Sequence, residues 1–318
     1  MSQRTLGAPG TSLHKDSWFR RVDGRQFRLT SVLFTLPFAL LFLTFTLLPI
    51  LSSVVLSFTY FNMLQPPSFI GLDNYIRLLL EDDVFLIALR NTFVFALLTG
   101  PISYILSFVF AWFITDFKRG MRTALTFLFY APSLAGNVYF IWTYIFSDDA
   151  FGLLNSTLLR MGVIRDSIQW LSDPNYAMGV VIVVIMWLSM SVGFLSFVAG
   201  LQSMDKSLYE AGAVDGVKNR FQELWYITLP QMVPQLLFGA VMQISASFAV
   251  GYEAMSLTGF PSTDYATHTI ILHILDYGSI RFEMGYASAI AVVLFFLMLL
   301  FWSLVKGGLR HFGEEESA

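Results

Sequence analysis

Several stretches of the chain are long enough to cross a membrane and contain no charged residue. A helix spans the apolar part of a bilayer with about 20 apolar residues, and a charge at its centre is strongly disfavoured. The charge-free stretches cover residues 29–72, 91–115, 123–147, 174–204, 224–252 and 284–305. The first is long enough for two spans, but Pro66, Pro67 and Gly71 interrupt its second half. The sequence therefore predicts six transmembrane helices, near residues 31–57, 92–115, 123–146, 176–201, 233–256 and 284–305.

Composition supports an all-α integral membrane protein. Hydrophobic residues make up 56% of the 318 residues and charged residues only 13%, whereas soluble domains carry about 25% charged residues. The chain has no cysteine, which excludes disulfides and thiolate metal sites. The polar first 28 residues lack the apolar core of a signal peptide. We therefore expect the first apolar stretch to remain as a span.

The distribution of Lys and Arg predicts the orientation. Both tails and the second and fourth loops hold 14 of the 19 basic residues, and the other three loops hold five. Because basic residues favour the cytoplasmic side, both termini are predicted to be cytoplasmic. The expected organisation is a tail over 1–30, which could lie along the membrane as an amphipathic helix or serve as a simple tether, a six-span core over 31–305 and a tail over 306–318.

The fourth loop, over 202–232, is predicted to form two short helices on the cytoplasmic surface. Ser207 followed by Glu210 is a capping-box pattern that would start a helix at Leu208. Gly216 stands where a glycine ends a helix. A second helix would run from about 219 to 226, and Pro230 would break the chain before the fifth span. A passive connector is usually shorter, so a docking element for a partner groove is the favoured interpretation.

The motif in this loop resembles the "EAA" loop of permease subunits in binding-protein-dependent ATP-binding-cassette importers. The family pattern is Glu-Ala-Ala, three residues, Gly, about nine residues, then Ile, any residue, Leu-Pro. Gly212 replaces the second alanine, and the spacing from glycine to isoleucine is one residue longer. The positions of the motif in this chain, with the Asp that precedes the glycine and the substituted Gly212, are Glu210, Ala211, Gly212, Asp215, Gly216, Ile227, Leu229 and Pro230.

A second resemblance lies near the C-terminus. The stretches LTGFPSTDYATHTI and MGYASAIAVVLFF are similar to the last outer loop and last span of carbohydrate permeases in that family. The segment EAGAVDG resembles the corresponding segment in one subgroup of these permeases. That subgroup imports oligosaccharides derived from polysaccharides, including acidic alginate- or pectin-type oligomers.

The family resemblance implies a fold, partners and a mechanism. It implies a type I importer permease fold in the cytoplasmic (inner) membrane, paired with a second similar permease, two ATPase subunits and an extracytoplasmic solute-binding protein. ATP and magnesium would be bound by the ATPases, since this chain has no phosphate-binding G-x-x-x-x-G-K-[ST] motif. No cofactor, metal or nucleic acid is expected in this chain, and its role would not be enzymatic. The acidic pairs Asp82–Asp83 and Asp148–Asp149, in the outer loops, are where the binding protein could dock.

Candidate residues of the substrate pathway are aromatic or uncharged polar, as sugar recognition requires, with one carboxylate as the exception. They are Tyr130, Asn137, Tyr139, Trp142, Trp187, Gln243, Ser247 and, at the outer end of span five, Glu253. Asn137 and Gln243 could equally join helices, and the two tryptophans fit an interfacial belt. Glu253 could be an interfacial carboxylate or lie at the mouth of the pathway. Pro132 and Gly136 could open the helix beside Asn137. His268 and His273, five residues apart, are predicted to be surface residues and not metal ligands.

Two other classes of protein compete with the importer subunit. A membrane-embedded hydrolase would need a motif such as G-x-S-x-G or H-E-x-x-H, and the chain has neither. A self-sufficient secondary carrier usually keeps ionisable residues deep in its spans, and the predicted spans have none there.

Overall fold

The computed structural model of the chain describes residues 24–136, 138–190 and 192–314. Contacts divide the chain into two compact units, Met1–Ser52 and Ser53–Ala318. Residues 1–23 of the expected N-terminal tail lie outside the described part, and residues 24–30 are already helical.

The first unit is a single apolar helical stretch. It consists of α1 (Gly24–Phe42), one π-helical turn η1 (Leu43–Leu47) and the beginning of α2 (Leu48–Leu56). Its large side chains from Val32 to Leu51 are mostly exposed. A helix that is apolar on all sides is typical of a membrane span, and this stretch is apolar enough to cross a membrane from Val32 to Leu56.

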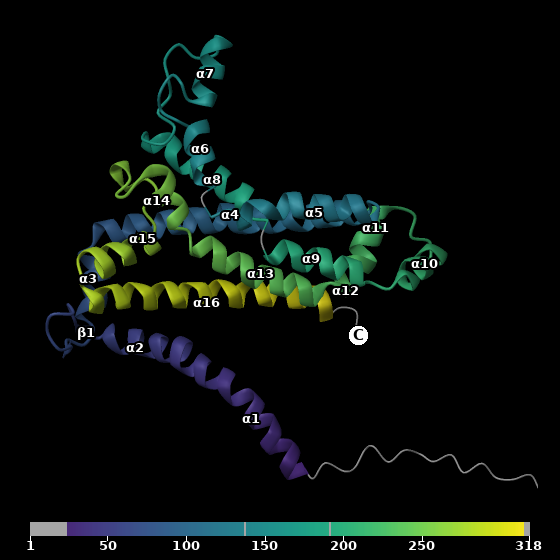
Figure 1. The fold of residues 1–318 in the computed structure, drawn as a ribbon, viewed down its shortest axis with the longest axis horizontal. Coiled ribbons are helices and arrows are strands. Elements are labelled where there is room, and N and C mark those ends of the chain that lie inside the picture. Colours follow the sequence, from purple (N-terminus) through teal and green to yellow (C-terminus); the bar gives the residue numbers. More distant parts are fainter. Residues whose placement is uncertain (1–23, 137, 191, 315–318) are drawn as a thin grey trace, which may run out of the picture. The chain divides into compact units, whose positions relative to one another are not determined.

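The second unit is a bundle of helices (Figure 1). A two-residue hairpin pairs β1 (Thr59–Tyr60) with β2 (Ser68–Phe69) in antiparallel register. The first half of the unit contains α3 (Asp73–Leu80), α4 (Asp83–Thr115), α5 (Arg119–Leu134), α6 (Tyr139–Ile145), α7 (Leu153–Arg160), α8 (Pro174–Leu188) and α9 (Val192–Ser203). The second half contains α10 (Lys206–Val214), α11 (Arg220–Glu223), η2 (Leu224–Thr228), α12 (Leu229–Gln231), α13 (Val233–Phe248), α14 (Tyr252–Thr258), η3 (Thr263–Tyr265), α15 (Ile270–Leu275), η4 (Asp276–Ile280) and α16 (Met284–Glu314).

Helix α4 is central to this bundle. It packs against α8, α9, α13 and α15, and its buried side chains enter three apolar clusters. Small residues allow close helix contacts, as is typical within membranes: a Cβ at Gly239 of α13 would stand 2.4 Å from Cζ of Phe197 on α9. The bundle has an end that carries α3 and α15, named here the α15 end, and an opposite end that carries α10, named the α10 end (Figure 1).

The predicted spans coincide with helical stretches, and the helices break inside the third, fourth and fifth of them. Over the described residues, four helices are long and apolar enough to cross a membrane, and up to six crossings result if each bent pair is one span. The first bent pair is α5 with α6, at 86°, beside Pro132, as the proline predicted. The second joins residues 220–231 to α13 at 80°, between Pro230 and Pro234. Predicted span five is shorter than expected, since α13 ends at Phe248 and α14 is a separate helix.

Residues 147–173, named here the α7 segment, form a projection with its own polar core. Asn155 is fully buried, and its Nδ2 lies within hydrogen-bond distance of the carbonyl oxygens of Ser147, Asp149 and Ile168. Its Oδ1 accepts from the backbone N–H of Ile168 at 3.1 Å and from Nε1 of Trp170 at 2.9 Å. One amide thus holds both ends of the segment together.

Candidate functional site

The 205–231 segment contains the two short helices that the sequence predicts, with a different start. Asp205 is the N-cap of α10, and its carboxylate accepts from the backbone N–H of Ser207 at 3.0 Å. This hydrogen bond lowers the pKa of Asp205 below its ordinary value. The predicted capping by Ser207 is therefore wrong, because the carboxylate two residues earlier already binds the first free N–H group.

The predicted end of α10 at Gly216 is confirmed. Gly216 has a φ of +94°, in the left-handed region that favours glycine. The N–H of Val217 donates to the carbonyl of Gly212 at 2.9 Å, and the N–H of Gly216 donates to that of Ala213 at 3.4 Å. These two bonds make a Schellman motif. The chain can then turn directly into the next helix.

The second helix begins as predicted and extends further. Asn219 is the N-cap of α11 and accepts from the N–H of Gln222 at 2.9 Å. In return, Gln222 Oε1 accepts from the N–H of Lys218 at 2.8 Å. The helix then continues through η2 and α12, past the expected end near residue 226.

The motif residues divide into an inner and an exposed set. A Cβ at Gly212 would stand only 2.5 Å from Cδ1 of Ile227, so the glycine makes room for this side chain. The hydroxyl of Tyr209 lies 3.0 Å from that of Thr228 and also joins α10 to η2. Gly212 is buried, Ile227, Leu229 and Pro230 are half-buried, and the exposed positions are Glu210, Ala211, Asp215 and Gly216. Figure 1 shows α10 at the tip of the bundle, at the α10 end.

The replacement of alanine by Gly212 thus has a physical reason in this chain. With alanine at position 212, Ile227 would have to move, and with glycine the two helices approach closely. The exposed face of α10 carries Glu210, Ala211 and Val214. The sequence could not reveal this pairing, because it depends on how α10 folds back onto η2.

The predicted pathway residues fall in separate places. Trp142 of α6 and Trp187 of α8 make an edge-to-face pair with ring centroids 5.2 Å apart. Tyr139 meets Tyr252 at 5.6 Å in the same region. The indole N–H of Trp142 is buried and has no hydrogen-bond partner within the described ranges. These aromatic side chains, from α6, α8 and α14, form what is named here the aromatic cluster.

Predicted pathway residues line two cavities, of which only the first adjoins the aromatic cluster. One, of about 620 Å³, lies between α4, α5 and α8, and Trp187, Phe110 and Pro132 contribute to its wall. Gln243 and Ser247 line a different cavity of about 440 Å³, between α4, α13 and α16. Gly100 borders that cavity, where its Cβ position is 3.3 Å from Ser247 Oγ.

The remaining pathway candidates have the following positions. Tyr130 packs on the edge of an apolar cluster formed by α4, α9 and α13. Glu253 accepts from the N–H of Gly251 at 3.2 Å, at the start of α14. Asn137 lies outside the described residues.

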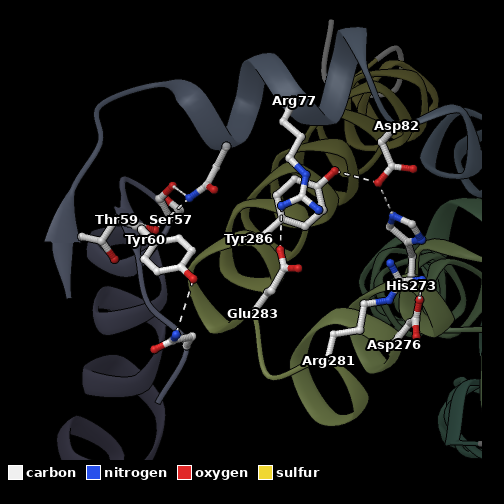
Figure 2. Close-up of polar contacts among 12 residues, drawn as sticks. Ser57, Thr59, Tyr60, Arg77, Asp82, His273, Asp276, Arg281, Glu283 and Tyr286 are labelled. Atoms are coloured by element: carbon white, nitrogen blue, oxygen red, sulfur yellow. Dashed lines mark hydrogen bonds and ion pairs between the residues drawn. The ribbon is translucent and has the colours of Figure 1, made fainter. Parts of the chain in front are cut away.

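A polar cluster at the α15 end was not predicted (Figure 2). His268 and His273 are buried, so their prediction as surface residues is wrong. His273 Nε2 lies 3.0 Å from Asp82 Oδ2, and His273 Nδ1 lies 3.2 Å from His268 Nε2. Since ionised Asp82 accepts from His273, His273 accepts in turn from His268. Helical spacing was misleading because His268 precedes α15 and His273 lies within it.

Two of the acidic side chains expected to bind a partner, Asp82 and Asp148, have hydrogen-bond partners inside the chain. Asp82 also accepts from the hydroxyl of Tyr286 at 2.7 Å and from the N–H of Phe85 at 2.9 Å. Burial opposes ionisation of Asp82, but these hydrogen bonds outweigh it and hold its pKa below the ordinary value. Asp148 accepts from the N–H of Leu171 at 2.8 Å and is part of the α7 segment.

Burial shapes the charge state of the two histidines. It lowers the pKa of His268 to about 4, with a smaller contribution from neighbouring His273. Burial also lowers the pKa of His273, although Asp82 opposes this effect. Both rings are therefore neutral at neutral pH. Among the described residues, no three His, Cys, Asp or Glu side chains come together in a way that could hold a metal ion.

The fold and the 205–231 segment define a mostly helical protein, with helices long and apolar enough to cross a membrane and a projection at one end of its bundle. Comparison with known proteins gives the family. No protein-family model matches the chain. It is 33% identical over 276 residues to the probable ABC transporter permease protein YesP of Bacillus subtilis, covering 85% of this chain and 87% of that protein.

A second relative and a solved structure agree. The arabinooligosaccharides transport system permease protein AraP of Bacillus subtilis is 30% identical over 276 residues, covering 84% of each chain. A chain of a bacterial alginate ABC transporter, solved with an alginate pentasaccharide-bound periplasmic protein, superposes with a TM-score of 0.73 at 22% identity, over 92% of this chain and 96% of that one. The chain belongs to the family of sugar permease proteins of ABC transporters.

Proposed function

We propose that this chain is the transmembrane subunit of an ATP-driven importer that moves an oligosaccharide across the cytoplasmic (inner) membrane. The observation that carries the proposal is α10, a nine-residue helix that is closed by Gly216 two residues beyond its end and packs on η2 through Gly212 and Ile227. An exposed helix with a fixed end can enter a groove on another protein. The α10 end would face the cytoplasm, together with both termini.

The proposed partners follow from the family and the solved relative. Two ATPase subunits would bind ATP and magnesium, a second similar permease would complete the pathway, and a solute-binding protein would deliver the sugar. Support comes from the alginate transporter, which was solved with a periplasmic protein that holds the sugar. Closure of the ATPases would displace α10 and change the tilt of the spans. Such rigid-body motion is a common way for a ligand on one subunit to act on another.

The aromatic cluster suits a sugar, since aromatic rings pack against the C–H faces of sugar rings. The N–H of Trp142, which has no hydrogen-bond partner among the described residues, could donate to a sugar hydroxyl. An acidic uronate oligomer is the first substrate to test, on the strength of the likeness to the alginate transporter. A neutral arabinose oligomer is the second, on the strength of the likeness to AraP.

The experiment is co-expression of the chain with candidate partner subunits, followed by reconstitution into vesicles. ATP hydrolysis and uptake are measured with binding protein loaded with uronate or arabinose oligomers. The proposal predicts that uptake requires ATP and the partner subunits. Uptake by the chain alone would support a self-sufficient carrier, and peptide or glycoside cleavage by the purified chain would support a hydrolase.

A further inference from the structure

Arg220, the first residue of α11, makes three kinds of contact with the end of α4. Its guanidinium forms an ion pair with Asp116, the C-cap of α4. Its Nη2 donates to the backbone carbonyl of Trp112 at 3.3 Å. The guanidinium carbon also lies 4.4 Å from the centroid of the Trp112 ring. One side chain thus binds a carboxylate, a carbonyl and an aromatic face of the same helix end.

The end of α4 is a favourable place for such a group. The last carbonyls of a helix have no partner within the helix and carry a partial negative charge, which Asp116 increases. A cation there is favourable, and the planar guanidinium can bind an oxygen and stack on a ring at once, as lysine cannot. The ring of Phe221 adds an apolar contact, 5.7 Å from the ring of Trp112.

These contacts bridge parts of the chain that are far apart in sequence. Trp112 and Arg220 are separated by 108 positions. Other polar contacts of the 205–231 segment, such as Tyr209 with Thr228 and Lys218 with Gln222, join residues of the segment to each other. Helix α4 in turn packs against α8, α9, α13 and α15. A displacement of its end therefore reaches the centre of the bundle.

We propose that Arg220 is a positioning residue that links the 205–231 segment to α4, so that movement of the segment by an ATPase also moves α4. This inference rests on the proposed function. It assigns a specific side chain to the transmission of motion, beyond the docking of α10 itself. A merely structural Arg220 would affect the amount of assembled complex, whereas a linking Arg220 affects how much sugar is moved for each ATP hydrolysed.

The test compares variants of the full reconstituted complex by the ratio of ATP hydrolysed to sugar transported. Arg220→Gln removes the charge and the fork, and Arg220→Lys keeps only the charge. We expect Arg220→Gln to raise the ratio at least about fivefold, the lower end of typical coupling between two sites, with an unchanged amount of bound ATPase. Arg220→Lys should lie between Arg220→Gln and the wild type. Exchanging the pair, Arg220→Asp with Asp116→Arg, should recover much of the coupling.

Arg119→Gln is the matched control, because Arg119 is exposed and follows the end of α4. This substitution removes the same positive charge as Arg220→Gln. It should leave the ratio unchanged. An unchanged ratio in Arg220→Gln would overturn the inference, as would loss of the bound ATPase in both Arg220→Gln and Arg220→Lys. The wild-type complex separates the two levels: if it shows no ATP-dependent uptake, the proposed function fails, whereas uptake with normal coupling in Arg220→Gln contradicts only the linking role.

Discussion

Replacing Gly216 tests whether the geometry of α10 matters for transport. The φ of +94° is costly for any L-residue with a side chain, by about 1–2 kcal/mol. A Cβ at this position would meet no atom within 4 Å. The expected penalty is therefore a property of the backbone and not of crowding. Valine, which is branched at Cβ, should reach at least the upper end of that range.

A penalty of about 2 kcal/mol lowers the population of the observed α10 end by about thirtyfold, since 1.4 kcal/mol corresponds to a factor of ten. A binding-competent state that is rarely populated weakens apparent affinity in proportion. We expect Gly216→Val to abolish ATP-dependent uptake and to uncouple ATP hydrolysis. Insertion into the membrane should be normal, because no span is altered.

The assay is uptake and ATP hydrolysis in vesicles, with membrane content measured for each variant. Gly216→Asn should be the mildest change, because asparagine tolerates the left-handed region best among residues with side chains. Gly120→Val is the control for Gly216→Val, since Gly120 also has open space around its Cβ position but lies in the first turn of α5. Normal uptake by Gly216→Val would refute the requirement for this helix end.

Three further changes probe other parts of the structure. Gly212→Ala should destabilise the packing of α10 on η2, and Ile227→Val, which removes Cδ1, should restore it; proteolysis of the segment in the single and double variants measures this coupling. Folding lowers the pKa of His268 from 6.5 to about 4, so as the pH falls the unfolded chain takes up this proton before the folded chain does. The contribution of His268 to the free energy of unfolding is therefore full above pH 6.5 and decreases towards pH 4 by up to about 3 kcal/mol. Thermal unfolding in detergent, measured against pH, detects this loss, and His268→Gln should flatten the curve. Asn155→Ala removes buried hydrogen bonds from the α7 segment and should cost about 3 kcal/mol, seen as protease cleavage confined to residues 147–173.

Each of these three expectations has a contrary result. Equal protease sensitivity of Gly212→Ala with and without Ile227→Val would show that the two side chains do not compete for space. A pH profile of unfolding that is the same in wild type and His268→Gln would contradict the burial of a neutral ring. Cleavage spread over the whole chain in Asn155→Ala would contradict a local role for that amide.

The sequence predicts the helical crossings and the helix ends well, because both are local properties. Charge-free length defines the spans, and Gly216 and Pro132 mark breaks that the structure contains. The sequence predicted the wrong N-cap for α10, because Ser207 and Asp205 lie within one turn of each other and either could cap the helix. Only the observed hydrogen bond from the N–H of Ser207 to Asp205 decides between them.

Contacts between distant segments were not predictable from local patterns. His268, His273 and Asp82 meet because a loop returns α15 to the beginning of α4. Likewise, Trp187 and Gln243 line different cavities because the crossing of the helices decides which faces meet. No periodicity along one helix contains that information.

The most direct test of the central claim is a site-specific crosslink to the ATPase. The chain has no natural cysteine, so an introduced one is unique. Val214 on α10 and Phe151 on the α7 segment are comparably exposed, at 88% and 85%, which makes Val214→Cys and Phe151→Cys a matched pair. The account predicts that, in the assembled complex, Val214→Cys crosslinks to the ATPase in an ATP-dependent manner and Phe151→Cys does not. A crosslink to the ATPase from Phe151→Cys, with none from Val214→Cys, would contradict it.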